Sequence, residues 1–119
     1  RAAKKIMETI NHPAIGINYD TGNCIFYGDS LPEEDIVHCL PWIIHIHLKD
    51  KIGGYKVWNF PTLGEGMVNF KKIFSILKEK QVDVPMSVEI EYSGSFEHPV
   101  TYVDECVKKS YDYLQKVIV

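Results

Sequence analysis

Two histidines and a lysine alternate with apolar residues in the segment 45–50, His-Ile-His-Leu-Lys-Asp. Because side chains alternate along a strand, His45, His47 and Lys49 would share one face and the apolar residues between them the other. The apolar face can pack beneath helices, while the polar face would point two imidazoles and an ammonium into a common space. Such a face suits a metal or sugar site better than a core. A pair of buried, hydrogen-bonded histidines beside a surface lysine is the other interpretation.

Residues that could bind a metal also lie at the ends of two other apolar segments. Asp20 closes the segment 14–20, and Glu89 lies near the end of 84–91. With His47 they offer two hard oxygens and one borderline nitrogen, a set that suits Mn²⁺, Co²⁺, Mg²⁺ or Zn²⁺. Asp20 could instead only form a turn, and Glu89 could only pair with a lysine at the edge of the core. Three such residues at three strand ends favour a shared site.

Helices are predicted before, between and after these three strands. The strands are expected over 14–20, 42–48 and 84–91, and the helices up to residue 10, over 30–40, over 68–80 and from residue 101 onward. Ser30 and Glu33 have the spacing of a capping box for the second helix, which Pro41 would end. The last helix would begin at a Thr101/Asp104 cap and carry an apolar stripe of Val103, Val107, Tyr111, Leu114 and Val117. This order predicts the α/β class, with parallel strands joined by right-handed crossovers in an open sheet or part of a (β/α)8 barrel. In such folds the C-terminal strand ends carry the chemistry. The long loop 50–66 is therefore expected to be functional.

The composition indicates an ordinary globular domain covering residues 1–119, with 45% hydrophobic and 24% charged residues. A net charge of −3 argues against a non-specific nucleic-acid binder, and no apolar run is long enough to span a membrane. Cys24, Cys39 and Cys106 are odd in number and widely spaced, which is typical of reduced thiols in a cytoplasmic protein. The sequence starts within a helical pattern and has no initiating Met, so we expect a piece of a longer protein.

Four segments resemble a known family in their order and spacing. They are Asn-Tyr-Asp-Thr-Gly-Asn at 18–23, His-Ile-His-Leu-Lys-Asp at 45–50, Leu-Gly-Glu-Gly at 63–66 and Ser-Val-Glu-Ile-Glu at 87–91. Together they resemble the last three βα units of the sugar phosphate isomerase/epimerase family, one of the xylose isomerase-like TIM barrels. The resemblance implies the C-terminal portion of a (β/α)8 barrel, with three parallel strands alternating with four helices.

The resemblance also implies a divalent metal at the barrel mouth, with Mn²⁺ as first choice, held by Glu, Asp, His and Glu from four successive strands. By this resemblance Asp20, His47 and Glu89 would be ligands, and the first Glu would belong to a strand preceding this sequence. That Glu and Glu89 would form the catalytic acid/base pair. Two carboxylates can transfer a proton beside a metal-polarised carbonyl, one on each face of an enediolate. The implied enzyme is a metal-dependent isomerase or epimerase of carbohydrate metabolism acting on a sugar or sugar phosphate.

Other polar and aromatic residues would contact this substrate. Lys49 could bind a substrate oxygen or be a solvated surface lysine. Trp58 could form an apolar wall for a sugar ring or pack on the barrel rim. Asn23 could hydrogen-bond a hydroxyl, but it stands where several ketose epimerases carry a titratable His, which argues against that activity.

Two residues neighbour the expected ligands. His45 would lie one layer deeper than His47 and could still reach the substrate. Glu91 faces the same way as Glu89 and is either a neighbouring contact or a rival ligand, with Glu89 preferred because Ser-Val-Glu is where the family ligand falls.

The same residues leave other functions open. A metal-dependent dehydratase or lyase acting on a keto-sugar or inosose could use this site, because it can eliminate as well as isomerise. A non-catalytic half-barrel for binding or assembly would not hold Mn²⁺. An endonuclease IV-like DNA repair enzyme needs a richer set of His and Asp for several zinc ions, including a His where Asn23 stands.

Three parallel strands cannot close an eight-stranded barrel, and they leave two open edges. We expect these edges to be covered by preceding βα units, by a second copy of the chain or by a complementary chain. The isolated chain is expected to be inactive.

Overall fold

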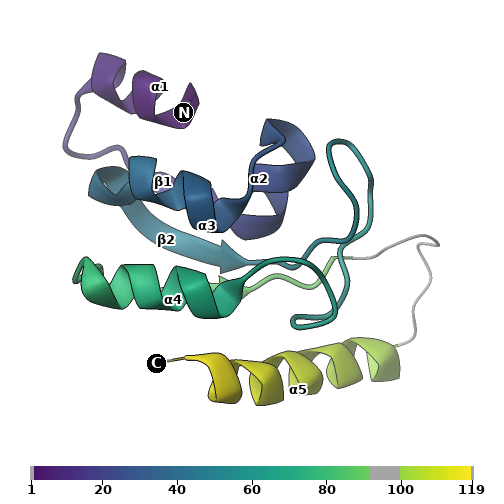
Figure 1. Ribbon diagram of the computed structural model, residues 1–119. Helices are drawn as coiled ribbons and strands as arrows, with labels where there is room; N and C mark the ends of the chain where they lie inside the picture. The colour runs from purple at the N-terminus through teal and green to yellow at the C-terminus, as the bar shows by residue number, and fades with distance from the viewer. Residues whose placement is uncertain (1, 92–99, 119) are drawn as a thin grey trace.

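The computed structural model describes residues 2–91 and 100–118 and has the expected α/β class. Its sheet has the order β1-β2-β3, formed by Ile17–Asp20, Ile43–Leu48 and Met86–Val88, and both pairings are parallel. Asp20 is the register partner of His47, which is in turn the partner of Ser87. The carboxyl ends of all three strands therefore meet at one edge of the molecule (Figure 1).

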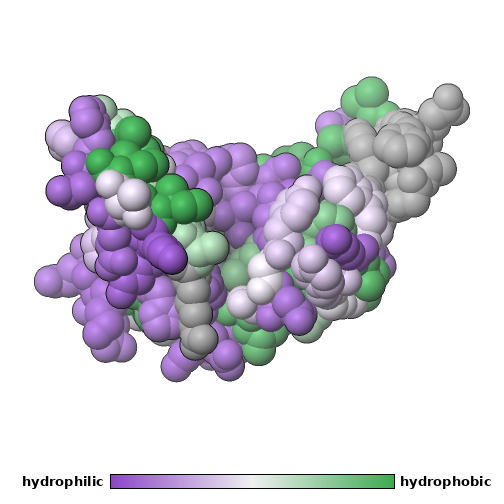
Figure 2. Space-filling model, turned by 90° about the horizontal axis from the view of Figure 1, so that it is seen from above, coloured by the Kyte–Doolittle hydropathy of each residue, from purple (hydrophilic) through white to green (hydrophobic). Residues whose placement is uncertain are grey.

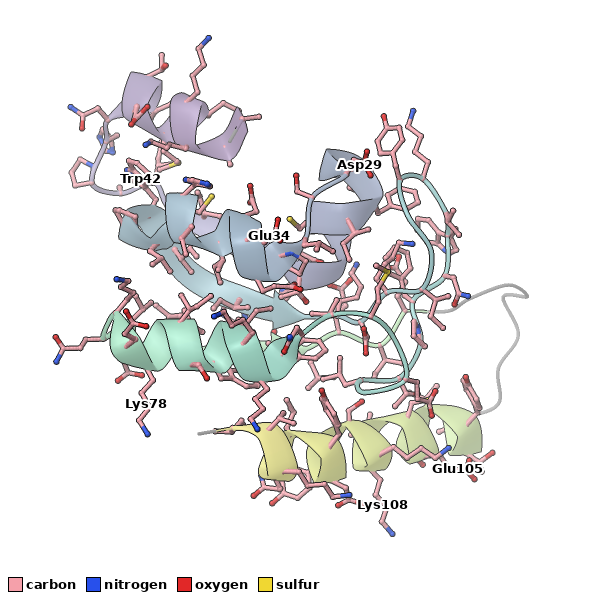
Figure 3. All side chains as sticks on the ribbon, in the orientation of Figure 1. Asp29, Glu34, Trp42, Lys78, Glu105 and Lys108 are labelled. Carbon is pink, nitrogen blue, oxygen red and sulfur yellow. The ribbon has the colours of Figure 1, made fainter. Side chains whose placement is uncertain are left out.

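The helices cover one face of this sheet. They are α1 (Ala2–Ile10), α2 (Thr21–Gly28), α3 (Pro32–Asp35), α4 (Phe70–Glu79) and α5 (Val100–Val117), with short 3-10 turns at Ile36–His38 and Leu40–Trp42. The α3 and α4 helices contact each other in front of the sheet, and α5 lies beside α4 (Figure 1). Lys78 on α4 and Lys108 on α5 project away from the sheet (Figure 3). No helix in the described part of the chain is long and apolar enough to cross a bilayer.

The core lies between the sheet and its helices. Tyr19, Ile46 and Leu48 point from alternate strand positions into a cluster that includes Ile73 and Leu77 of α4. The residues that alternate with these three along β1 and β2 point to the opposite face of the sheet, which is the polar face that the sequence predicts.

The N-terminal helix α1 remains largely uncovered. Ile6 and Ile10 are exposed, and apolar side chains gather at this end of the molecule (Figure 2). Of α1, only Met7 is buried.

The segment after β1 forms a helix where the sequence predicted a turn. The Asp20 side chain accepts a hydrogen bond from the backbone N–H of Asn23 and caps α2. The helix ends at Gly28, and the C-cap residue Asp29 has a left-handed φ of 48°. Its sequence lacks a clear apolar stripe and contains Gly22, so the periodicity gave no helical signal.

The predicted capping box at Ser30 and Glu33 is wrong. Leu31 is the N-cap of α3 and makes no side-chain capping bond, whereas the Ser30 hydroxyl donates to the carbonyl of Gly28. Pro32 begins the helix, a position where its missing N–H costs nothing. Pro41 lies inside the second 3-10 turn rather than ending an α-helix.

The last helix also differs from its prediction. Thr101 lies inside α5, so it is no cap. Cys106 and Ser110 face the core, while Val107 and Tyr111 of the predicted stripe are 51% and 61% exposed. Apolar residues occupy two adjoining faces of α5, and the spacing alone does not tell which face is buried. The sequence also indicates a polar segment over 93–99 before this helix, and that segment lies outside the described residues.

The buried carboxylate of Asp50 fixes the long loop after β2. It accepts backbone hydrogen bonds from Lys51, Gly64, Gly66 and Val68 over 2.8–3.1 Å. A Cβ on Gly66 would collide with this carboxylate, and Gly64 has a φ of 90°, which only glycine adopts easily. The Gly-Glu-Gly motif is thus the backbone half of a binding site for Asp50.

Lys51 holds the other part of this loop. Its side chain is fully buried, and its ammonium donates to the carbonyls of Ile52 and Gly53 at 2.7 and 2.9 Å. Burial lowers the pKa of Lys51. The two neighbouring residues Asp50 and Lys51 therefore satisfy loop donors and acceptors respectively.

We predict that Asp50→Asn lowers the free energy of unfolding by about 3 kcal/mol, because an amide cannot accept all four N–H bonds and loses their charge-assisted strength. Denaturant titration followed by circular dichroism measures this change. Asp112→Asn, at an exposed position of α5, is the matched control and should change stability by less than about 0.5 kcal/mol. Equal stability of the two variants would contradict the role of Asp50.

Candidate metal centre

Asp20, His47 and Glu89 meet at the C-terminal edge of the sheet. One ligand atom of each lies within 4.8 Å of the others, and within residues 2–91 and 100–118 no other group of three His, Cys, Asp or Glu side chains meets this criterion. The His47 Nδ1 atom is 2.9 Å from Glu89 Oε2 and 3.9 Å from Asp20 Oδ2. The parallel register brings them together, because Asp20 ends β1 beside His47 and Glu89 directly follows β3.

Asp20 uses its two carboxylate oxygens for different purposes. Oδ1 accepts the N–H of Asn23 and caps α2, whereas Oδ2 faces Lys49 and His47. The two interpretations of Asp20, as a local capping residue and as a ligand, are therefore compatible in one side chain.

Lys49 is not the solvated surface lysine that the sequence left open. Its side chain is only 3% exposed, and its ammonium lies 3.2 Å from Asp20, 3.3 Å from Glu89 and 2.6 Å from Glu91. One ammonium thus faces three carboxylates, which leaves an excess of negative charge at the edge of the sheet. This excess, together with the O/N/O donor set, fits a bound divalent cation.

Thr21 and Gly22 position the Lys49 side chain, and the sequence did not single them out. The Thr21 hydroxyl donates to the backbone carbonyl of Lys49 at 2.7 Å and accepts its N–H at 2.9 Å, which ties the end of β1 to the end of β2. A Cβ on Gly22 would come within 2.9 Å of Lys49 Cγ, so glycine leaves the path for this side chain. Thr and Gly are common after any strand, and nothing in their spacing marked them.

Burial and neighbouring charges shift the pKa values of the ionisable residues at this site. Burial raises the pKa of Asp20, and the Asn23 N–H and Lys49 only partly offset it. Burial also acts to raise the pKa of Glu89. The positive charge of Lys49, a hydrogen bond with Asp20 and the neighbouring His47 ring outweigh burial, and they hold the pKa of Glu89 below its ordinary range. For Lys49, burial is outweighed by Glu91, Asp20 and Glu89, and its pKa is raised. Glu89 is therefore the more easily ionised carboxylate of the pair that it forms with Asp20.

A second polar row lies beside the three candidate ligands. The His45 ring is 5.4 Å from the His47 ring, and its Nε2 is 2.9 Å from the Ser87 hydroxyl. Asn18 Nδ2 lies 3.2 Å from His47 Nε2, on the side of that ring opposite the carboxylates. Sequence reasoning missed Asn18, whose alternation with Asp20 was the available signal.

The remaining predicted substrate contacts surround this centre at different distances. Asn23 and Asp20 line a cavity of about 590 Å³ along the open edge of β1. Glu91 bonds Lys49 and does not belong to the group of three candidate ligands. Trp58 is half exposed, and its ring lies edge-on to Phe60 at 5.1 Å.

Phe60 connects Trp58 to the centre. It is buried, and the Lys49 ammonium lies 4.8 Å from its ring centroid. The Phe60 ring therefore contacts both the Trp58 ring and the Lys49 ammonium.

Comparison with known proteins agrees with this architecture. A family model described as a xylose isomerase-like TIM barrel matches residues 1–116. Inosose dehydratases from Clostridium botulinum (strain Eklund 17B / Type B) and Clostridium tetani are 26% and 27% identical over 113 residues, which is 82% of this chain and 38% of each relative. The chain thus spans less than half the length of these curated relatives.

Solved structures show the same fold. A xylose isomerase domain protein from Planctomyces limnophilus superimposes with a TM-score of 0.80 at 23% identity, covering 98% of this chain and 42% of that one. One from Alicyclobacillus acidocaldarius gives 0.73 at 16% identity, with 98% and 41% covered. The three strands and their helices are therefore a partial TIM barrel of this type.

We predict that Lys49→Met lowers the free energy of unfolding of the metal-free protein by about 2 kcal/mol, because three partly buried carboxylates lose their cation. Added Mn²⁺ should raise the melting temperature of this variant by more than it raises that of the wild type, since an ion would then supply the missing positive charge. Thermal melts with and without Mn²⁺ measure both effects.

Lys80→Met is the matched control for this experiment. Lys80 pairs with Glu79 on the surface, where both side chains are more than half exposed, and its loss should cost less than about 0.5 kcal/mol. A Lys49→Met protein as stable as this control would contradict the proposed charge balance.

Proposed function

Because the chain belongs to the xylose isomerase-like TIM barrel family, we propose that it forms part of a divalent-metal-dependent isomerase or epimerase. This enzyme would move a proton at the carbon beside the carbonyl of a sugar or sugar phosphate. The observation that carries this proposal is the meeting of Asp20, His47 and Glu89 within 4.8 Å at the C-terminal ends of three parallel strands. Chemistry in α/β barrels occurs at these strand ends.

In this proposal Asp20, His47 and Glu89 hold the ion, and a further carboxylate from a strand outside the three described completes the set. Mn²⁺ is the first choice, with Co²⁺, Mg²⁺ and Zn²⁺ compatible with the same donors. When bound, the ion would polarise the substrate carbonyl and so make the neighbouring C–H more acidic.

Glu89 acts as the catalytic base and acid in this scheme. Its lowered pKa keeps it ionised, so it can accept the proton from carbon. In an epimerisation the further carboxylate would deliver a proton to the opposite face of the enediolate, whereas in an isomerisation Glu89 could return its proton to the neighbouring carbon. Lys49 keeps Glu89 ionised and holds Glu91 away from the ion. His45 and Asn23 are suited to hydrogen bonds with substrate hydroxyls, and Trp58 to packing against the apolar face of a sugar ring.

A dehydratase acting on a keto-sugar or inosose is the second candidate, favoured by the inosose dehydratase names of the curated relatives. Glu89 would again take the proton beside the carbonyl. The hydroxyl on the next carbon would then leave with a proton as water, and a carbon–carbon double bond would form. No oxidant or reductant is needed. Asn23, in place of a titratable His, is consistent with this candidate.

The acidic cluster and the three cysteines support a proposed substrate class and a proposed cellular location. One acidic cluster favours a small sugar over nucleic acid, since an endonuclease IV-like centre would need several zinc ions. Cys24, Cys39 and Cys106 are free thiols, which supports a cytoplasmic location. We propose that the open edges of β1 and β3 are covered by other βα units of a barrel or by a second chain.

We predict that Asp20→Ala and His47→Ala each weaken Mn²⁺ binding by at least about tenfold, because each removes a proposed ligand. Electron paramagnetic resonance of free Mn²⁺ during titration measures the affinity directly. His38→Ala, in the 3-10 turn after α3, is the matched control and should bind as the wild type does. Absence of Mn²⁺ binding even in a complete barrel that contains this chain would indicate a non-catalytic half-barrel instead.

The product distinguishes the two candidate reactions. In D₂O with Mn²⁺ and a keto-sugar or inosose, the complete barrel that contains this chain should place deuterium on the carbon beside the carbonyl if it isomerises or epimerises. A dehydratase should instead yield a product that has lost one water and absorbs in the ultraviolet as an enone. Glu89→Gln should abolish either reaction while circular dichroism stays unchanged. Full activity of Glu89→Gln would remove Glu89 from the mechanism.

A further inference from the structure

Asn18 lies beside His47 but outside the group of candidate ligands. It belongs to β1 and points to the same face as Asp20, two residues further along the strand. Its Nδ2 atom is 3.2 Å from Nε2 of His47. The other nitrogen of that ring, Nδ1, is the one that faces Glu89 and Asp20. The imidazole is thus held between an amide on one side and two carboxylates on the other.

We propose that Asn18 is a positioning residue that orients the His47 ring, so that Nδ1 is the nitrogen presented to the ion. This inference rests on the proposed metal centre and adds to it the choice of ligand atom and the group that enforces it. A ligating histidine generally donates its other ring N–H to an acceptor, which fixes both the tautomer and the ring orientation.

The amide can serve both states of the ring. With the amide oriented as in the structure, its NH₂ group can only donate, so Nε2 would accept and the proton of a neutral ring would be on Nδ1, toward Glu89. When Nδ1 instead binds an ion, Nε2 carries the proton and needs an acceptor. A half-turn of the amide exchanges Nδ2 for Oδ1 and supplies that acceptor without moving the strand. A leucine of similar size could do neither.

No other described side chain makes a recorded hydrogen bond to His47 Nε2. His45 lies edge-on to His47, and its own Nε2 is used by Ser87. Asn18 therefore provides a function that the rest of the polar face does not duplicate.

The test compares Mn²⁺ affinity in Asn18→Leu, Asn18→Asp and Ser87→Ala proteins by electron paramagnetic resonance. Asn18→Leu should bind Mn²⁺ about 10- to 100-fold more weakly, as is typical when such a partner of a metal-binding histidine is removed. Asn18→Asp should bind as well as the wild type, because its carboxylate accepts the Nε2 proton. Ser87→Ala, which removes a bond to His45 only, is the matched control and should change little.

A spectroscopic readout separates positioning from simple stability. Long-range ¹H–¹⁵N spectra of the histidine rings should show His47 protonated at Nδ1 in the neutral metal-free protein, and at Nε2 once diamagnetic Zn²⁺ is bound. This measurement uses the wild type, so coordination through Nε2 would overturn the inference even if Asn18→Leu does not fold.

Two results would overturn the inference while leaving the metal centre intact. They are wild-type Mn²⁺ affinity in Asn18→Leu and a Zn²⁺-bound spectrum that identifies Nε2 as the coordinating atom. If even a complete barrel that contains this chain bound neither ion, the metal centre would be overturned, and this inference with it.

Discussion

The ammonium group of Lys49 joins the ends of all three strands. It comes from the end of β2 and lies within 3.3 Å of carboxylates that follow or end β1 and β3. A charge this deeply buried is stable only while its partners stay in place, because an unpaired buried charge costs several kcal/mol. The space beside Gly22, the two Thr21 hydrogen bonds and the Phe60 ring all serve to hold this one group. Its ion pairs hold two of the candidate ligands, Asp20 and Glu89, at the strand ends that the parallel register brings together.

The same ammonium sets the electrostatics of the centre. It neutralises one of the three carboxylates it meets, and the remaining negative charge makes the edge of the sheet attractive to a divalent cation. It also lowers the pKa of Glu89 against the effect of burial. The strand ends are thus held together by a cation of the protein and remain receptive to a second one.

The sequence predicted the features that depend on local periodicity. Alternation at His45, His47 and Lys49 placed them on one face, and the strand–helix order implied the parallel register that joins Asp20 to Glu89. The features it could not predict depend on contacts distant in the chain. The burial of Lys49 requires carboxylates some thirty to forty residues away on each side. The Gly-Glu-Gly motif makes physical sense only once Asp50 is seen to bind its N–H groups. Ser30 and Glu33 have the spacing of a capping box, but the helix begins at Pro32 and needs no side-chain cap.

The anchoring of the long loop has an evolutionary consequence. Asp50 and Lys51 bind backbone atoms, so they hold the loop through groups that every residue possesses. Side chains between Ile52 and Asn59 can then be exchanged over generations without detaching the loop from the sheet, provided that the glycines remain. The segment around Trp58 is consequently free to diversify while the three strands and the candidate metal centre stay constant. New contacts beside the centre can therefore arise in this segment at little cost in stability.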